Sequence, residues 1–276
     1  MGLRINTNLS ALAASRALSK TQEAQTTSYE RLATGSRINH AVDDAAGLSI
    51  SENLRTQIRG MSQAERNAND GISFAQVAEG GLSEIGNIMV RLRELAIQAG
   101  SDTVGDKERG FINKETKSLL QEVDRIANST TFNGTPLLNG EGKDLQFQVG
   151  LYNSKNDSIH FDTRDHDVRA SSLNIDGLNF STLDDARDGI DKIDKALNQV
   201  LGARADLGAI QNRLHSTVSV LGSTKEGLTE AHSRIADTDI ATETSELVQK
   251  NILSSAGISV LAQANSQQSQ ALKLLG

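Results

Sequence analysis

One short segment holds the residues best suited to metal chemistry. His160, Asp162, Asp165, His166 and Asp167 follow one another closely in the sequence. Imidazole nitrogens and carboxylate oxygens are common ligands of divalent cations. The spacing is weak as a ligand signature, however, and turn-forming residues surround the candidates. We therefore interpret the segment as a solvated acidic loop and expect no metal or other cofactor there.

Asp43 and Asp44 are candidates for acid–base catalysis, because adjacent carboxylates can shift each other's pKa values. Consecutive residues on a helix do not face one another, however. We expect both carboxylates to cap a helix that begins directly after them. His40, His215 and His232 lie far apart in the sequence, and no Ser-His-Asp or phosphate-loop pattern accompanies them. The sequence predicts a protein that is not an enzyme.

Composition excludes further classes. The 276 residues include no cysteine, which rules out disulfides, thiol catalysis and cysteine-ligated zinc. A net charge of −7 does not favour nucleic acid as a partner. No stretch approaches the roughly 20 apolar residues of a membrane span, and the N-terminus lacks the apolar region of a secretory signal peptide. With 3% aromatic residues, the core must consist of aliphatic side chains and alanine, which suits long helices in contact along their length.

A seven-residue repeat dominates the second half of the chain. One position of the repeat is always apolar, which is typical of a helix that packs along a continuous seam. Its companion position includes Arg204, Gln211 and Lys225, as in coiled coils whose polar groups fix the register and reduce stability. We expect Thr182 and Asp185 to form the capping box that starts this helix. The predicted coiled-coil seam consists of Ile193, Val200, Leu207, Leu214, Leu221, Leu228 and Ile235.

Two earlier stretches share the helical period, at residues 54–96 and 112–126, and we expect them to be partner helices of a bundle. Gly80 and Gly81 interrupt the first pattern and predict a local bend or loosened turn. Turn-forming residues gather between residues 130 and 180, where two alternating segments predict a β-hairpin. The predicted fold is mainly α, a long antiparallel helical bundle or coiled-coil rod with a small β-hairpin region at about 130–180.

The two ends of the chain are poor in charge. No ionisable side chain occurs between Asn251 and Leu272. The apolar residues there keep a helical spacing, with Leu253, Ala256 and Val260 on one face, but they are too sparse for the segment to bury itself alone. We expect both ends to become ordered on association. The candidate assembly residues are Leu9, Leu12, Leu253, Val260, Leu261 and Leu275.

Several sequence blocks, found in order along the chain, resemble a known family. The first half contains RLATGSRIN at 31–39, DDAAG at 43–47 and RNANDGIS at 66–73. The second half contains DLGAIQNR at 206–213, SRIADTD at 233–239 and VLAQAN at 260–265. Together these blocks resemble the N-terminal and C-terminal halves of bacterial flagellin.

The resemblance implies a structural subunit that polymerises with copies of itself into the flagellar filament used for swimming. Terminal helices at 1–43 and 236–276 would form the inner filament core, and residues 44–235 an outer rod. The resemblance also implies type III-like secretion to the extracellular filament, with an export chaperone, a cap and hook-junction proteins as partners. The alternatives are a hook–filament junction protein and, less in keeping with the blocks, a signalling coiled coil.

A further implication concerns host recognition. Flagellins are bound by Toll-like receptor 5 through a motif that matches Arg91, Leu95 and Glu115 here, while Val90 departs from it. Arg91 and Leu95 are four residues apart and are expected to share a helix face. A charged group and an apolar side chain could then enter one interface.

Overall fold

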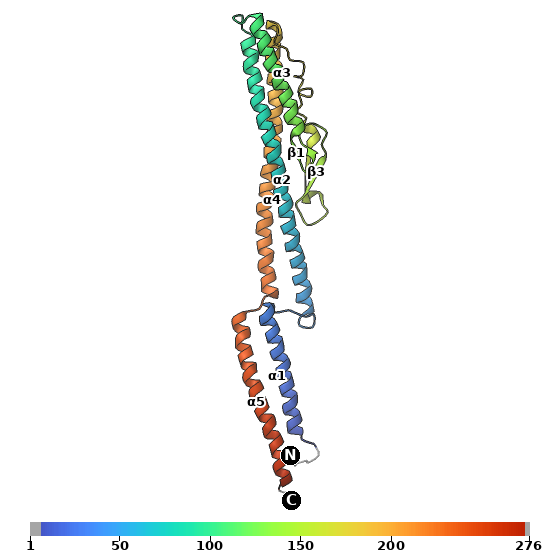
Figure 1. Ribbon diagram of the computed structural model, residues 1–276. Helices are drawn as coiled ribbons and strands as arrows, with labels where there is room; N and C mark the ends of the chain where they lie inside the picture. The colour runs from blue at the N-terminus through green and yellow to red at the C-terminus, as the bar shows by residue number, and fades with distance from the viewer. Residues whose placement is uncertain (1–6, 274–276) are drawn as a thin grey trace. The chain divides into compact units, whose positions relative to one another are not determined.

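The computed structural model describes residues 7–273, with side chains up to residue 267. Helices account for most of this part of the chain, which confirms the predicted mainly α fold (Figure 1). The helices are α1 (Leu9–Thr34), α2 (Ala45–Ala99), α3 (Asp106–Ser129), α4 (Leu183–Ala236) and α5 (Ile240–Lys273). The strands are β1 (Thr131–Phe132), β2 (Thr135–Pro136), β3 (Asp144–Gln148) and β4 (Ser158–Asp162), with 3-10 turns at Lys155–Asp157 and Thr163–His166.

The chain divides into two compact units. The first contains Met1–Thr56 and Gly227–Gly276, and the second contains Gln57–Glu226. The division falls inside α2 and inside α4, so each of these helices contributes to both units. None of the helices within residues 7–273 has the length and hydrophobicity that crossing a membrane requires.

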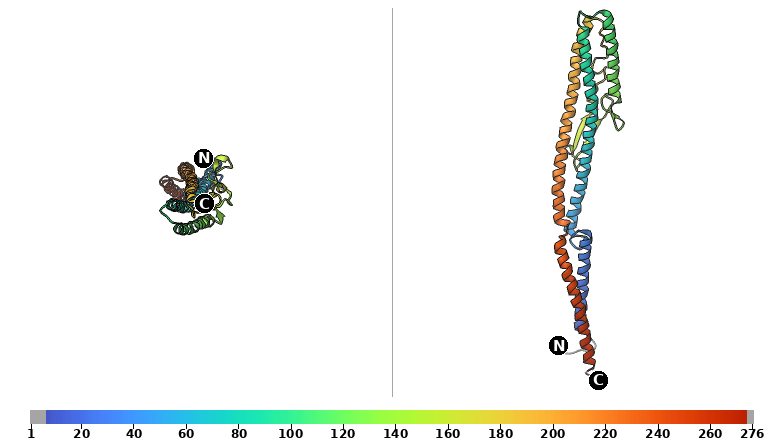
Figure 2. Two further views of the ribbon diagram at one scale, coloured as in Figure 1. Left: turned by 90° about the horizontal axis from the view of Figure 1, so that it is seen from above. Right: turned by 60° about the vertical axis from the view of Figure 1, so that its left-hand side comes forward.

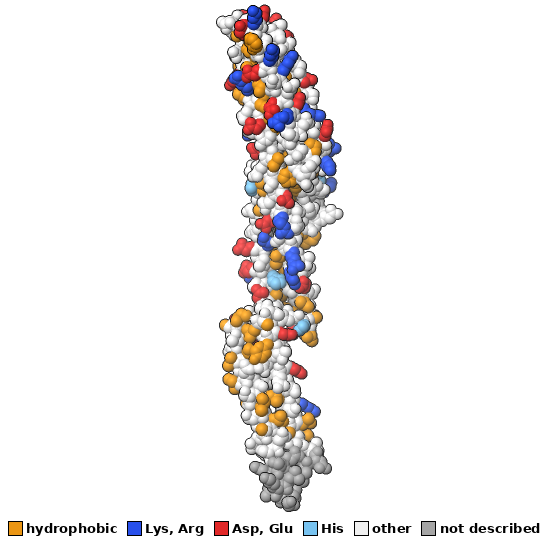
Figure 3. Space-filling model, in the orientation of Figure 1, with side chains coloured by type: hydrophobic (Ala, Val, Ile, Leu, Met, Phe, Trp, Pro, Cys, Tyr) orange, Lys and Arg blue, Asp and Glu red, His pale blue; other side chains and the backbone are white. Residues whose placement is uncertain are grey.

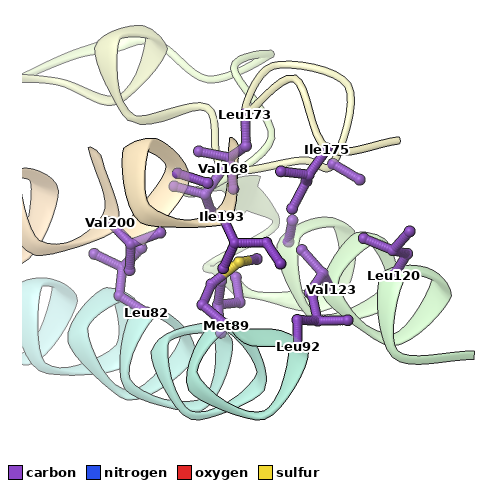
Figure 4. Close-up of a cluster of buried hydrophobic side chains, with 14 of the residues drawn as sticks. Leu82, Met89, Leu92, Leu120, Val123, Val168, Leu173, Ile175, Ile193 and Val200 are labelled. Carbon is purple, nitrogen blue, oxygen red and sulfur yellow. The ribbon is translucent and has the colours of Figure 1, made fainter. Parts of the chain in front are cut away.

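In the second unit, α2, α3 and α4 form a bundle around an aliphatic core. Leu82 of α2 points towards Val200 of α4, Met89 towards Ile193 of α4, and Leu92 towards Val123 of α3 (Figure 4). All of these side chains are buried. The segment between β4 and α4 covers the remaining side of this core. Its contributions to the core include Val168, Leu173, Ile175, Leu178 and Phe180.

The polar positions of the α4 repeat are matched by carboxylates on α2. Glu79 lies 3.7 Å from the Arg204 guanidinium and accepts a 3.0 Å hydrogen bond from Gln211. Lys225 Nζ lies 2.6 Å from a carboxylate oxygen of Glu65. Residues later in α4 thus contact residues earlier in α2, so the two helices are antiparallel.

Thr182 caps the start of α4 as predicted, and Asp185 is its partner through a side-chain bond. The Thr182 hydroxyl accepts a 3.2 Å hydrogen bond from the Asp185 amide and donates to the Asp185 carboxylate over 2.6 Å. α2 continues as a helix through Gly80 and Gly81, so the bend or loosened turn predicted there does not end it and stays a prediction. Gly81 allows close packing, since a Cβ there would lie 2.8 Å from atoms of Leu138 and Thr130.

Two antiparallel hairpins complete the second unit. β1 pairs with β2 around the turn at Asn133 and Gly134, and β3 pairs with β4 as predicted. Phe132, Phe147 and Phe161 come from three different strands, and their ring centroids lie 5.9, 5.7 and 5.5 Å from that of Phe74 on α2. This aromatic cluster attaches both hairpins to the bundle.

In the first unit, α1 and α5 lie side by side in both side views (Figure 1, Figure 2). Asn8 donates a 2.9 Å hydrogen bond to the Ala264 carbonyl, while Ser28, at the other end of α1, contacts Glu243 at the start of α5. The two helices are therefore antiparallel. A left-handed Gly35, with φ 69°, ends α1.

The expected role of Asp43 and Asp44 is only half right. The Asp44 carboxylate accepts a 2.9 Å hydrogen bond from the Gly47 amide at the start of α2, as a capping residue does. Asp43 accepts instead from the amides of His40 and Asn39, and these bonds lower the pKa of its carboxyl group. Asp43 thus stabilises the loop before α2 rather than the helix itself.

Candidate assembly surface

The seam between α1 and α5 combines small and polar residues with a few leucines. The α5 residues that turn towards α1 recur at intervals of three and four, and they are buried or half-buried. At Gly257 the helices approach so closely that a Cβ would lie 3.3 Å from Leu18 of α1. The α5 side of the seam consists of Glu243, Leu247, Lys250, Ser254, Gly257, Leu261 and Ala264, and the α1 side includes Ala11, Ala14, Leu18, Thr21, Gln25 and Ser28.

A buried polar network occupies one end of this seam. The Ser28 hydroxyl donates to Glu243 over 2.5 Å, and Lys250 donates to the Ser28 oxygen over 2.6 Å. Arg31 lies 3.6 Å from the second Glu243 oxygen, and the Glu243 side chain is only 9% exposed. Because a buried charge without its partner is strongly destabilising, the network favours one register of α1 against α5.

Many large apolar side chains of this helix pair lie outside the seam. Leu9 is 65% exposed and Ile252 is 64% exposed, although both are large aliphatic residues. Hydrophobic side chains accordingly gather over α5 on the face drawn in Figure 3. A soluble monomer rarely exposes apolar surface of this extent, which marks the outer face as an interaction surface.

The candidate assembly residues fall into three groups. Leu9, Leu12, Leu253 and Val260 are exposed, whereas Leu261 is half-buried at the seam. Leu275 lies outside the described residues. Their role in assembly stays a prediction.

Leu253, Ala256 and Val260, which the sequence places on one face of α5, are all exposed, whereas Ala264, four residues further on, is buried. The predicted face did not include Val248, Ile252 and Ile258, which are also exposed. These residues are not in one helical row, so a search for a single apolar stripe does not find them.

The residues of the predicted coiled-coil seam of α4 are more deeply buried in the second unit than in the first. Ile193, Val200, Leu207 and Leu214 are at most 1% exposed, and Leu221 is also buried, all within the second unit. Leu228 and Ile235, which belong to the first unit, are half-buried.

The receptor-binding candidates differ in their exposure to solvent. Arg91 on α2 donates hydrogen bonds of 3.0 and 2.8 Å to Glu115 on α3, and another of 3.0 Å to Glu94. Arg91 and Glu115 are both exposed, but Leu95 is 2% exposed and lies in the core. The expectation that Leu95 presents an apolar contact beside Arg91 is therefore wrong for this conformation. A residue four positions along a helix points about 40° away from the first residue, and this difference turns Leu95 inward.

The His- and Asp-rich segment is held together by its own ion pairs. Arg164 donates to both oxygens of Asp162 and holds the pKa of that carboxyl at about 2. His166 stacks on Phe161 with ring centroids 4.7 Å apart, and burial lowers the pKa of its imidazole. Within the described residues, no group of three or more potential ligand side chains is arranged to hold a metal ion.

Comparison with known proteins bears on the whole chain. A family model for the bacterial flagellin N-terminal helical region matches residues 5–143, and one for the C-terminal helical region matches residues 190–275. Flagellin of Bacillus subtilis (strain 168) is 40% identical over 303 residues, which cover 99% of this chain and 100% of the relative. A flagellar filament 30.7 kDa core protein of Treponema maltophilum is 38% identical and covers 98% of this chain and 99% of its own length.

Solved structures agree with these matches. The crystal structure of Bacillus cereus flagellin has a TM-score of 0.51 and 31% identity, and the match covers 56% of this chain and 88% of that one. A putative flagellar hook-associated protein from Vibrio parahaemolyticus has a TM-score of 0.57 at 14% identity, covering 71% and 100% of the two chains, and supports the fold alone. With matched models at both ends and full-length relatives near 40% identity, the chain belongs to the bacterial flagellin family.

Proposed function

We propose that this chain is a structural subunit of the flagellar filament and that its assembly surface is the outer face of α1 and α5. The observation that carries the proposal is how this pair distributes its side chains: most seam residues are polar or small, while Leu9, Ile252 and Val260 are exposed. Neighbouring copies of the same chain would supply the missing apolar contacts. The family is structural, so no catalytic role is assigned.

The rival functions are not favoured. The full-length relatives are flagellins and filament core proteins, whereas the hook-associated neighbour is similar in fold alone. In the proposed filament, the terminal helices at 1–43 and 236–276 form the inner core and residues 44–235 the outer part. Polymerisation would then order the terminal helices, in the manner of coupled folding and binding. Type III-like secretion and an export chaperone, cap and hook-junction contacts belong to the same proposal.

Deleting residues 253–276 tests the assembly surface. The truncated protein should keep the second unit folded, because the deleted residues belong to the first unit, but should not polymerise. Circular dichroism reports the fold, and light scattering after addition of filament seeds reports growth. Filaments of normal length from the truncated protein would refute the proposal.

A matched variant separates loss of the helix from loss of its outer face. Ile252→Ser with Val260→Ser removes exposed apolar side chains and leaves the α1–α5 seam unchanged. This double variant should also fail to elongate seeds. Thr242→Ser, at an exposed polar position of the same helix, should polymerise as the wild type does.

Receptor recognition is a second proposal, favoured by the exposed Arg91–Glu115 pair. If Arg91 anchors Toll-like receptor 5, Arg91→Asp should weaken binding of the free subunit by at least ~2 kcal/mol, because the charge is reversed and the bidentate donor is lost. An exposed ion pair contributes only about 0–1 kcal/mol to folding, so the variant should remain folded. Receptor affinity measured alongside circular dichroism checks both expectations.

Arg125→Asp is the matched control for this experiment. Arg125 is an exposed arginine on α3 whose partner is Glu122, so its reversal changes charge without touching the Arg91 contacts. Affinity should be lost with Arg91→Asp and retained with Arg125→Asp. Unchanged affinity in a folded Arg91→Asp protein would reject the assignment, and absence of binding by the wild type would show that the motif is insufficient.

A further inference from the structure

The β region contains two Asn-Gly sequences in opposite surroundings, at 133–134 and 139–140. We propose that Asn133 is a site of spontaneous deamidation with water as the co-reactant, and that the fold protects Asn139 from the same reaction. The inference concerns chemical modification of the subunit and does not depend on the proposed assembly surface.

The reaction needs no group beyond the dipeptide and water. The backbone nitrogen of Gly134 gives up its proton and attacks Cγ of Asn133, forming a carbon–nitrogen bond. The bond from Cγ to Nδ2 breaks, and the amide nitrogen leaves as ammonia, taking up the proton. The resulting cyclic succinimide adds water at either carbonyl, which opens the ring to aspartate or isoaspartate. The net change is addition of water and loss of ammonia.

Asn133 and Gly134 form the exposed tip of the β1–β2 hairpin. Both have positive φ, 48° and 75°, as a two-residue type I′ turn requires. Among the described residues no hydrogen bond engages the Asn133 side chain, and nothing lies within 4 Å of a Cβ placed on Gly134. The attacking nitrogen and the amide carbon are therefore open to solvent.

Attack also requires rotation about the Cα–C bond of Asn133, which opens the turn. The strand pairing here consists of Thr131 with Pro136 and Phe132 with Thr135. Because so few contacts hold the tip, a local opening of the turn should need far less free energy than unfolding of the bundle.

Asn139 also precedes a glycine, but unlike Asn133 it is enclosed by the protein. Its side chain is buried, and its Oδ1 accepts a 3.1 Å hydrogen bond from the Glu141 amide. A carboxylate oxygen of Asp167 lies 2.7 Å from the place where a Cβ on Gly140 would stand. Burial of Asn139 and this close approach of Asp167 hinder the rotation that attack of the Gly140 nitrogen on Cγ requires.

The modification would change the hairpin as well as its charge. Aspartate adds a negative charge at the tip, and isoaspartate adds a methylene to the backbone and cannot keep the two-residue turn. Phe132 would be affected directly, because it precedes the turn and packs edge-on against Phe74. Deamidation at Asn133 should therefore loosen the attachment of β1 and β2 to α2.

The test follows both sites in one sample. Folded full-length protein is incubated at mildly alkaline pH, digested, and analysed by mass spectrometry for exchange of the amide NH2 for OH, with enzymatic methylation to count isoaspartate. We expect Asn133 to react at least about tenfold faster than Asn139, the factor that a local opening of ~1.4 kcal/mol imposes. In protein unfolded with urea the two rates should become similar.

Each outcome decides the proposal. Equal rates in the folded protein, or an unreacted Asn133 beside a reacting Asn139, would overturn it. If Asn133 reacts in urea but not in the folded protein, the turn protects it, and the proposal is also overturned. Asn133→Gln should remove the signal at 133 and leave the rate at 139 unchanged. If that variant does not fold, the comparison of the two sites in the wild type still stands.

Discussion

Replacing Glu243 with alanine is expected to raise the critical concentration for polymerisation about a hundredfold, since the loss of one partner from a buried ion pair is worth roughly 3 kcal/mol. Glu243 accepts from Ser28 and faces Arg31 across the α1–α5 seam, and Lys250 of its own helix lies 3.8 Å away. Without it, both cations and the buried hydroxyl lose their shared acceptor. The measurement is the concentration of free subunit that remains in equilibrium with filaments.

Two further variants separate burial from simple loss of charge. Glu243→Gln keeps an oxygen for the Ser28 hydroxyl but loses the ion pairs, so its effect should be intermediate. Glu230 is a matched exposed glutamate of the same unit, paired with Arg234 one helical turn away. Glu230→Ala should shift the critical concentration by less than about threefold, because exposed pairs of this kind contribute ~0.3–0.5 kcal/mol. Similar shifts for Glu243→Ala and Glu230→Ala would mean that the network has no structural role.

Leu214→Ala should destabilise the second unit by roughly 2–5 kcal/mol, the range observed for buried leucines that leave a cavity. Leu214 is fully buried on α4 and packs against Ala68 and Ile72 of α2 and against Val149 and Ile159 of the hairpin region. The loss therefore affects the contact between bundle and hairpin. Thermal or urea unfolding of the purified protein measures it.

Lys225→Ala serves as the control, eleven residues further along the same helix. Lys225 contacts Glu65 with both side chains about one-third exposed, so its removal should reduce stability by at most ~1 kcal/mol. Equal destabilisation by the two substitutions would mean that the heptad register of α4 is misassigned.

The sequence predicts those parts of the fold whose signals are local. The apolar repeat of α4 identifies a helix because every turn presents the same side to the bundle, and Thr182 with Asp185 marks its start. The alternation before Gly150 likewise predicts β3, since each second side chain meets the core. In these cases the pattern and the packing have the same period.

Long-range contacts leave no comparable signal. The cluster around Phe74 joins α2 to strands that lie much further along the sequence, and no spacing rule relates Phe74 to their phenylalanines. Ser28 and Glu243 are separated by 215 positions, and a polar pair at that distance is indistinguishable from two solvated residues. The apolar spacing therefore indicates the outer face of α5, whereas the face that contacts α1 consists largely of small and polar residues.

The scattered apolar residues of α5 have a kinetic consequence. At about 100° per residue, Ile258 and Val260 point in directions about 200° apart, so no single neighbour can cover both. Two subunits that meet in solution would leave much of this surface in water, whereas a site already surrounded by several subunits would cover it at once. We therefore expect a high barrier to nucleation and rapid addition at existing ends, so that dilute subunits remain dispersed until a growing end is present.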